Sequence, residues 1–169
     1  MNQNLTKRIV VTGVIAAIYT VLTLILAPIS FGPVQFRLSE IMVLLAFVDP
    51  LYIIGLTLGC LMSNMLGGFG IMDIVFGSLA TFMSCVAMYW TRNTIKNIKA
   101  SLLVASIWPT VFNGVIIGWM LHVTINVPMF ITMIQVALGE FVVVTVIGVP
   151  LGRLFAKKYG KYFQRIGLA

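Results

Sequence analysis

Acidic residues and histidine are both scarce in this chain. The sequence holds four Asp and Glu residues and one His among 169 residues. A single histidine leaves little for general acid–base chemistry, and neither an H-E-x-x-H pattern nor a serine, histidine and acid set is present. The sequence also contains no G-x-x-x-x-G-K-[ST] phosphate loop, so the chain does not hydrolyse ATP by that route. We therefore expect a protein that is not an enzyme; chemistry built on carboxylates alone is the remaining enzymatic alternative.

Cysteine is nearly as rare. Cys60 and Cys85 lie in separate apolar runs, and the sequence has neither a C-x-x-C spacing nor a cysteine–histidine cluster. This pattern indicates no disulfide framework and no metal site, and no cofactor is expected. We interpret both residues as buried thiols that pack as small apolar groups.

Apolar residues, by contrast, fill most of the chain. They make up 60% of the residues, charged residues make up 9%, and the mean hydropathy is +1.09. In soluble proteins about half of the residues are apolar and about a quarter are charged. The composition therefore predicts an all-α integral membrane protein. Met1–Arg8 and the following apolar run could mimic a signal peptide, but the run from Ile9 to Ala27 lacks a clear cleavage site and is interpreted as a retained helix.

The apolar runs predict six membrane-spanning helices in one transmembrane domain, 1–169. A spanning helix needs about 20 apolar residues, because the hydrocarbon core is about 30 Å thick. We expect helices over residues 9–27, 37–48, 51–66, 71–90, 101–121 and 129–151. The second is only about 12 residues, or about 18 Å as an α-helix, and is too short to cross unless the preceding loop continues it.

Positive charge gives the helices a direction. Ten of the eleven Lys and Arg residues fall on one side of a six-helix bundle. They are Lys7, Arg8, Arg92, Lys96, Lys99, Arg153, Lys157, Lys158, Lys161 and Arg165. The positive-inside rule then puts both termini in the cytoplasm. A cytoplasmic membrane face accounts for the net charge of +7, so no nucleic-acid partner is implied. Arg37, at the outer end of the second helix, is the exception.

Polar side chains of five helices are expected at similar depth, in the outer half of the bundle. Ionisable groups at such depth cost about 2.5–3.5 kcal/mol each and normally face a cavity or a partner. Their convergence predicts a binding pocket that opens to the outside. Its expected members are Glu40, Asn64, Asp73, Asn113, Gln135 and Glu140, with Arg37 at the rim.

Most of these residues have a ready structural explanation. Arg37 and Glu40, spaced i and i+3, could simply pair with each other. Asp73 could meet the dipole of a helix N-terminus. Asn64 and Asn113 could join neighbouring helices. Glu140 is harder to explain, because its segment, VALGEFVVV, holds no cation.

Gly13 and Ala17 form a small-x-x-x-small pair in the first helix. Such a spacing allows a second helix to approach closely, although it also arises by chance in apolar helices.

Several stretches together resemble the queuosine-precursor transporter family of the QueT type. They are FRLSEIMVLLAF, IIGLTLGCLMSNMLGGFGIMDIVFGSLATF, PTVFNGVIIGWML and ALGEFVVVTVIGVPL, and the similarity runs from about Thr6 to Arg153. Members of this family are substrate-binding S components of energy-coupling factor (ECF) transporters.

This resemblance implies a six-helix S-component fold in the bacterial cell membrane and a small substrate related to 7-deazaguanine. It also implies a separate ECF module of one transmembrane coupling protein and two cytoplasmic ATPases. S components typically carry an A-x-x-x-A motif that contacts the coupling protein. Here Gly13 replaces the first Ala, and Ala17 matches the second.

A 7-deazaguanine would suit the expected pocket. Its N1–H and 2-amino group are parallel donors that match the two oxygens of one carboxylate, from Glu40 or Glu140. A positively charged aminomethyl substituent could meet the other glutamate or Asp73. The candidate donors to the 6-oxo group are Asn64, Asn113, Gln135 and Arg37. The candidate faces for the flat ring are Phe36, Phe112 and Trp108.

The residues leave other functions open. An S component could instead take another purine-like or vitamin-like solute. A small membrane enzyme or a channel subunit is the alternative from a different class.

Overall fold

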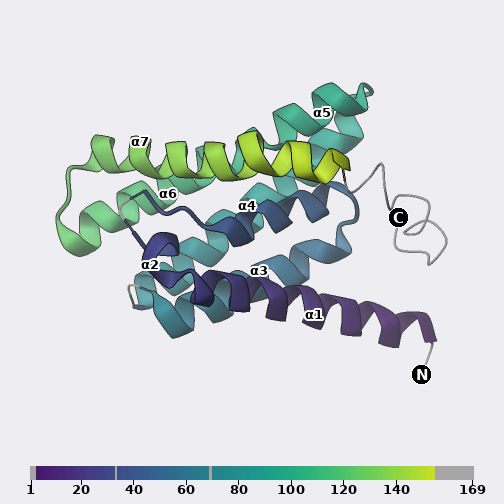
Figure 1. The fold of residues 1–169 in the computed structure, drawn as a ribbon, viewed down its shortest axis with the longest axis horizontal. Coiled ribbons are helices and arrows are strands. Elements are labelled where there is room, and N and C mark those ends of the chain that lie inside the picture. Colours follow the sequence, from purple (N-terminus) through teal and green to yellow (C-terminus); the bar gives the residue numbers. More distant parts are fainter. Residues whose placement is uncertain (1–2, 33, 69, 155–169) are drawn as a thin grey trace.

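The computed structural model describes residues 3–32, 34–68 and 70–154, and within these residues every regular element is a helix. The elements are α1 (Gln3–Ile25), α2 (Ala27–Ser30), η1 (Leu38–Phe47), α3 (Leu51–Gly67), α4 (Ile71–Thr94), α5 (Ile98–Ala105), α6 (Ile107–Ile125), α7 (Met129–Glu140) and η2 (Phe141–Gly148). The long helices lie side by side along one axis (Figure 1). The start of α1 and the end of the last helix lie at the same end of the bundle (Figure 1).

Four of the described helical segments are long and apolar enough to cross a membrane, as expected of a multi-pass membrane protein. They are Leu5–Ile25, Ile71–Thr94, Ile98–Ile125 and Met129–Leu154. Two shorter apolar helices, Leu38–Phe47 and Leu51–Gly67, complete the set. The all-helical fold class is confirmed within the described residues, whereas six crossings, cytoplasmic termini and a single domain stay predictions.

Several helix boundaries differ from the sequence-based ones. Helix α1 begins at Gln3 instead of Ile9, and α4 continues to Thr94. The expected helix 101–121 is two helices, α5 and α6, that meet at Ser106. Pro109 explains the break, because proline has no N–H and its ring collides with the carbonyl four residues earlier.

The basic loop expected between the fourth and fifth helices is shorter than predicted, because Arg92 belongs to α4 and Lys99 to α5. Asn97 caps α5 by accepting hydrogen bonds from the Lys99 and Ala100 N–H groups at 3.1 and 3.2 Å. Lys157, Lys158, Lys161 and Arg165 lie outside the described residues.

The second apolar segment is a 3-10 helix, η1. Ten residues of 3-10 helix rise about 20 Å, against about 15 Å for an α-helix of the same number. The segment is therefore longer than its residue count indicates. Three residues per turn place Glu40, Val43 and Ala46 in one line, and all three are at most 1% exposed.

Glycines bring pairs of helices into close contact. Gly55 and Gly59 of α3 face α1, where an added Cβ would come within 2.8 Å of the Thr12 carbonyl oxygen and of the Tyr19 Cβ, respectively. Gly114 and Gly118 of α6 face α7 in the same way, against Ala137 and Met133. Both pairs have the G-x-x-x-G spacing that allows backbones of membrane helices to approach. The first pair fixes Tyr19, which belongs to the candidate site.

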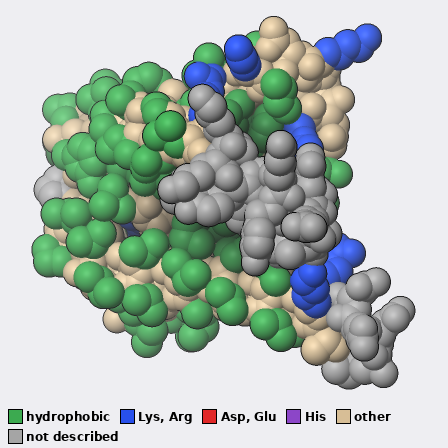
Figure 2. Space-filling model, turned by 45° about the vertical axis from the view of Figure 1, so that its right-hand side comes forward, with side chains coloured by type: hydrophobic (Ala, Val, Ile, Leu, Met, Phe, Trp, Pro, Cys, Tyr) green, Lys and Arg blue, Asp and Glu red, His purple; other side chains and the backbone are tan. Residues whose placement is uncertain are grey.

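The surface of the bundle is apolar along its length and basic at one end. On the face drawn in Figure 2, hydrophobic side chains cover the length of the bundle, while Lys and Arg side chains gather toward the end where α1 begins. Exposed apolar residues such as Val14, Val75 and Ile134 suit a lipid environment.

Candidate functional site

Buried polar residues from α1, η1, α3, α4 and α7 meet in the interior of the bundle. We call this set the polar cluster; it consists of Tyr19, Arg37, Glu40, Cys60, Asn64, Asp73, Thr81 and Glu140. Each of them is at most 3% exposed. Burial of so many polar groups costs free energy unless they find partners, so the unused atoms of the cluster make it the candidate ligand site.

Glu40 uses one carboxylate oxygen and leaves the other unused. Its Oε1 accepts hydrogen bonds from the hydroxyls of Tyr19 and Thr81, the latter at 3.4 Å. Its Oε2 is buried and has no hydrogen-bond partner among the described residues. The carboxylate is thus held by α1 and α4 with one acceptor oxygen available.

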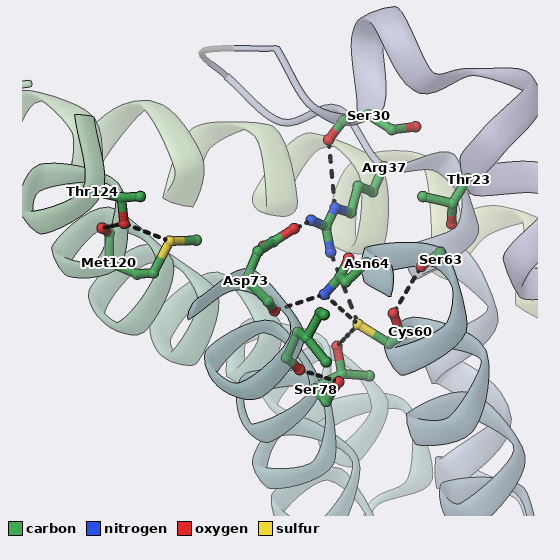
Figure 3. A network of polar contacts seen from close by, with 12 residues as sticks. Thr23, Ser30, Arg37, Cys60, Ser63, Asn64, Asp73, Ser78, Met120 and Thr124 are labelled. Atoms are coloured by element: carbon green, nitrogen blue, oxygen red, sulfur yellow. Dashed lines mark hydrogen bonds and ion pairs between the residues drawn. The ribbon is translucent and has the colours of Figure 1, made fainter. Parts of the chain in front are cut away.

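Arg37 pairs with Asp73 and not with Glu40. Its Nη2 lies 3.7 Å from Asp73 Oδ1, while its Nε donates to the Ser30 carbonyl at 3.4 Å (Figure 3). The guanidinium also lies 5.1 Å from the centroid of the Phe31 ring. The short-range pairing of Arg37 with Glu40 is therefore not found; the guanidinium instead joins the segment before η1 to α4.

Cys60 occupies the middle of the cluster. Its sulfur lies 3.9 Å from Arg37 Nη1, 3.6 Å from Asn64 Nδ2 and 3.2 Å from Thr81 Oγ1 (Figure 3). Cys60 is a buried free thiol of the hydrophobic core, as expected, but three polar donors also face its sulfur, so it does more than pack as a small apolar group. Cys85 matches the expectation of a buried thiol, since it is buried within the hydrophobic core.

Asn64 bridges α3 and α4. Its Nδ2 donates to the Asp73 carbonyl at 3.0 Å, and its Oδ1 is buried without a hydrogen-bond partner among the described residues. Gly77 leaves room for this amide, because an added Cβ there would overlap Nδ2. Asn64 therefore joins two helices, as a structural role requires, and also offers an unused acceptor to the interior.

Glu140 enters the cluster from α7, at the junction with the π-helix η2. It is 3% exposed, and its Oε2 has no hydrogen-bond partner in the described part of the chain. It lies close enough to Glu40 and Arg37 for their charges to interact with its own. Gly139 allows this approach, because an added Cβ would overlap the Val34 carbonyl oxygen in the segment that leads to Arg37.

The structure also shows a residue that the sequence did not single out. Gln35 has a positive φ of 49°, is 2% exposed, and its Nε2 has no hydrogen-bond partner among the described residues. Positive φ is uncommon outside glycine and marks a constrained backbone. Gln35 lies in the same segment as Arg37 and adds a donor at a buried position.

Two residues expected in the pocket, Asn113 and Gln135, have no hydrogen bond to the polar cluster among the described residues. Asn113 is 3% exposed in α6, and its Nδ2 lacks a hydrogen-bond partner among the described residues. Gln135 is half-buried and lines a separate small cavity of about 170 Å³ with Phe31, Leu121 and Ile125.

None of the aromatic residues chosen from the sequence has a hydrogen bond or ring contact to a cluster residue among the described residues. Trp108 stacks on Phe112 with ring centroids 5.6 Å apart, and its indole N–H donates to Thr91 at 2.8 Å. Thr91 lies ten residues, or about 15 Å, beyond Thr81 along α4. Phe36 is 36% exposed. The aromatic rings that touch the cluster residues are instead those of Tyr19 and Phe31.

Gly13 and Ala17 lie on an exposed face of α1. An added Cβ at Gly13 would meet no atom within 4 Å, and both residues are exposed. Tyr19 and Ile15 are buried on the other side of the same helix. The pair is therefore not used for packing within the described chain.

In the part of the chain that the structure describes, no group of three or more His, Cys, Asp and Glu side chains could hold a metal ion.

Comparison with known proteins places these features in a family. A family model described as "QueT transporter" matches residues 9–157. A curated relative from Lactococcus lactis subsp. cremoris (strain MG1363), named queuosine precursor transporter QueT, is 40% identical over 96 residues. That alignment covers 54% of this chain and 56% of the relative, so the chain spans about half the length of the curated relative that it matches. No solved structure matches the chain.

Proposed function

From the premise that this chain belongs to the QueT transporter family, we propose that it is the substrate-binding S subunit of an ATP-driven ECF importer. Its substrate is a queuosine precursor or a related 7-deazaguanine. Support comes from the name of the curated relative, and the lack of a phosphate loop in the sequence agrees with ATP hydrolysis on separate subunits. The two cytoplasmic ATPases and the coupling protein of the ECF module supply that work.

The observation that carries the ligand assignment is the pair of unused carboxylate oxygens. Glu40 Oε2 and Glu140 Oε2 are both buried acceptors without a hydrogen-bond partner among the described residues. A ligand that presents several donors would complement these two acceptors. The N1–H and the 2-amino group of a 7-deazaguanine are such donors, and hydrogen bonds to a carboxylate are stronger than neutral ones.

The donors in the site complement the remaining edge of the base. Gln35 Nε2 is a buried donor without a partner in the described residues, and the Arg37 guanidinium lies 3.7 Å from Asp73. Either group serves the 6-oxo oxygen. Ion pairing with Asp73 holds the guanidinium in place.

The charge of the cluster favours a positively charged ligand. Three carboxylates, Glu40, Asp73 and Glu140, share the interior with one guanidinium, that of Arg37. A precursor with an aminomethyl substituent would supply the missing cation, and one with a neutral substituent would not. Pairing with a cation would stabilise the charged form of a buried carboxylate, so the cationic precursor is the preferred one.

Access is proposed from the outside of the cell. The basic end of the bundle corresponds to the cytoplasmic face under the positive-inside rule, and Arg37 and Asp73 lie toward the other end of η1 and α4. The exposed face around Gly13 and Ala17 is the proposed contact with the coupling protein, because small residues allow another helix to approach.

The direct test is ligand binding by the purified chain, measured by calorimetry against a panel of deazapurines, nucleobases and vitamins. We expect saturable binding of a 7-deazaguanine, tightest for the aminomethyl form, without turnover and without flux in the absence of the ECF module. Preferred binding of a vitamin or an unmodified nucleobase would show an S component for another solute. Flux or product formed by the chain alone would instead show a channel or an enzyme.

A further inference from the structure

A second cavity lies at the basic end of the bundle, away from the polar cluster. Its volume is about 600 Å³, and its lining residues come from η1, α4, α5 and the end of the helical segment Met129–Leu154. Its lining residues are Leu44, Phe47, Val48, Arg92, Ile98, Lys99, Leu102, Gly152 and Arg153. We call it the basic cavity, because three of these side chains are cationic and the others are apolar or glycine.

No carboxylate among the described residues lines the basic cavity. The chain has only four acidic residues. Three of them belong to the polar cluster, and the fourth, Asp49, uses its Oδ1 to accept a hydrogen bond from the Leu51 N–H at 2.8 Å. Asp49 follows the lining residue Val48 in the chain, but no acidic residue is among the described residues that line the cavity.

Arg92 is fixed at the wall of the cavity. Its Nη1 donates to the Phe47 carbonyl at 2.6 Å and to the Val48 carbonyl, and its guanidinium lies 5.6 Å from the centroid of the Phe47 ring. Arg92 thus closes the end of η1 and carries its charge into the cavity. Lys99 and Arg153 are exposed, and no side-chain partner is found for either within the described residues. These two cations are available to a ligand.

The position and lining of the cavity identify the chemistry of that ligand. A basic wall calls for an anion, whereas Leu44, Phe47 and Leu102 provide an apolar floor. Ile98 of the lining is 58% exposed, and Trp90, near the same end of α4 as Arg92, is 66% exposed. Tryptophan at a helix end marks the level of lipid headgroups, and basic pockets between helices at that level suit anionic headgroups.

We propose that the basic cavity binds the phosphate headgroup of an anionic phospholipid, with Lys99 and Arg153 on the phosphate and an acyl chain over the apolar floor. Arg92 adds charge while it holds the end of η1. The site is independent of the transported substrate, because it shares no residue with the polar cluster.

The test compares two double variants of the full chain in nanodiscs. Lys99→Gln/Arg153→Gln removes two cavity charges, and Arg8→Gln/Lys96→Gln removes the same charge from the same end of the bundle outside the cavity. Bound lipid is counted by native mass spectrometry, and thermal unfolding is followed in phosphatidylglycerol and in phosphatidylcholine. Inorganic phosphate in phosphatidylcholine discs is the third arm.

We expect phosphatidylglycerol to bind the unmodified protein and the control variant and to raise their unfolding temperature. The cavity variant should bind it roughly 30-fold more weakly, from about 1 kcal/mol for each basic residue near an anionic surface. Equal losses in the two variants, equal binding of the two lipids, or the same stabilisation by inorganic phosphate would each overturn the proposal. If the cavity variant unfolds in phosphatidylcholine, Lys99→Gln against Lys96→Gln repeats the comparison with a single charge.

Discussion

The hydroxyl of Tyr19 donates a hydrogen bond to Glu40 Oε1 across 21 positions of the chain. Both residues are at most 1% exposed, and Gly59 allows α1 to approach closely enough for the bond to form. The bond fixes which oxygen of Glu40 is left for a ligand. Tyr19 of α1 therefore determines which carboxylate oxygen of Glu40 can accept a hydrogen bond from a ligand.

Tyr19→Phe removes this donor and little else. We expect affinity for the 7-deazaguanine ligand to fall about tenfold, because a hydrogen bond to a charged group contributes about 1.5–3 kcal/mol and Thr81 still contacts the same oxygen. Calorimetric titration of the purified variant measures the loss. Tyr89→Phe, at a tyrosine packed on the core away from Glu40, is the control. Unchanged affinity in Tyr19→Phe would show that Thr81 alone positions Glu40.

Glu140→Gln and Glu40→Gln test which carboxylate reads the base. Each change replaces one acceptor oxygen by a donor, so loss of a charged hydrogen bond should weaken binding about 10- to 150-fold. The change should matter less for a 2-deamino analogue, which never formed the second bond. Binding of both ligands to both variants completes the cycle. Equal mutational costs for the two ligands would show that the carboxylate in question does not read the 2-amino group.

The Arg37–Asp73 pair predicts that substitutions at the two residues have strongly non-additive effects on the unfolding free energy. Arg37→Gln alone leaves Asp73 buried without its guanidinium partner, which should cost about 3–5 kcal/mol of unfolding free energy. Arg37→Gln/Asp73→Asn removes both charges and should lose less than the sum of the two single changes. Chemical denaturation in detergent measures all three variants. Additive costs would mean that the two residues, 3.7 Å apart, do not stabilise each other.

Two glycines predict opposite phenotypes for the same substitution. Gly59→Leu forces a side chain against Tyr19, so it should lower both stability and ligand affinity. Gly13→Leu meets no atom within 4 Å and should leave ligand binding unchanged while it impairs uptake with the ECF module. Ala17→Leu should behave like Gly13→Leu. Loss of binding in step with uptake at Gly13 would place that face inside the bundle instead.

Topology is testable with reporter fusions. Because α4 continues to Thr94, the first fusion point belongs in the connection to α5 at Lys96, and the second belongs at Ala169. Both reporters should read cytoplasmic, in line with the positive-inside rule. An external signal at either point would contradict six crossings.

Much of the candidate site could be predicted from the sequence, because ionisable residues in apolar helices are costly to bury and normally face a cavity or a partner. Glu40, Asp73 and Glu140 came directly from that argument, and the structure brings all three into one cluster. Tyr19, Cys60 and Thr81 were missed for the opposite reason. Their side chains are common in membrane helices, and only contacts between distant segments reveal which of them face a carboxylate.

The type of helix formed by the second apolar segment could not be predicted from the sequence either. Apolar content predicted the second segment as a helix, but an α-helix and a 3-10 helix of ten residues have the same composition. Trp108 was chosen by residue type, and the bond of its indole to Thr91 places it about 15 Å further along α4 than Thr81. Distances of this kind depend on how neighbouring helices are offset, which composition does not fix.

The direction in which the Glu40 side chain points depends on η1 being a 3-10 helix and not an α-helix. Each residue turns the chain by about 120° in a 3-10 helix and by about 100° in an α-helix. Over the six steps from Glu40 to Ala46, conversion to an α-helix rotates the carboxylate by about 120° and shortens the segment by about 3 Å. Rewinding ten residues would thus turn Glu40 away from Tyr19 while every long helix of the bundle stayed in place.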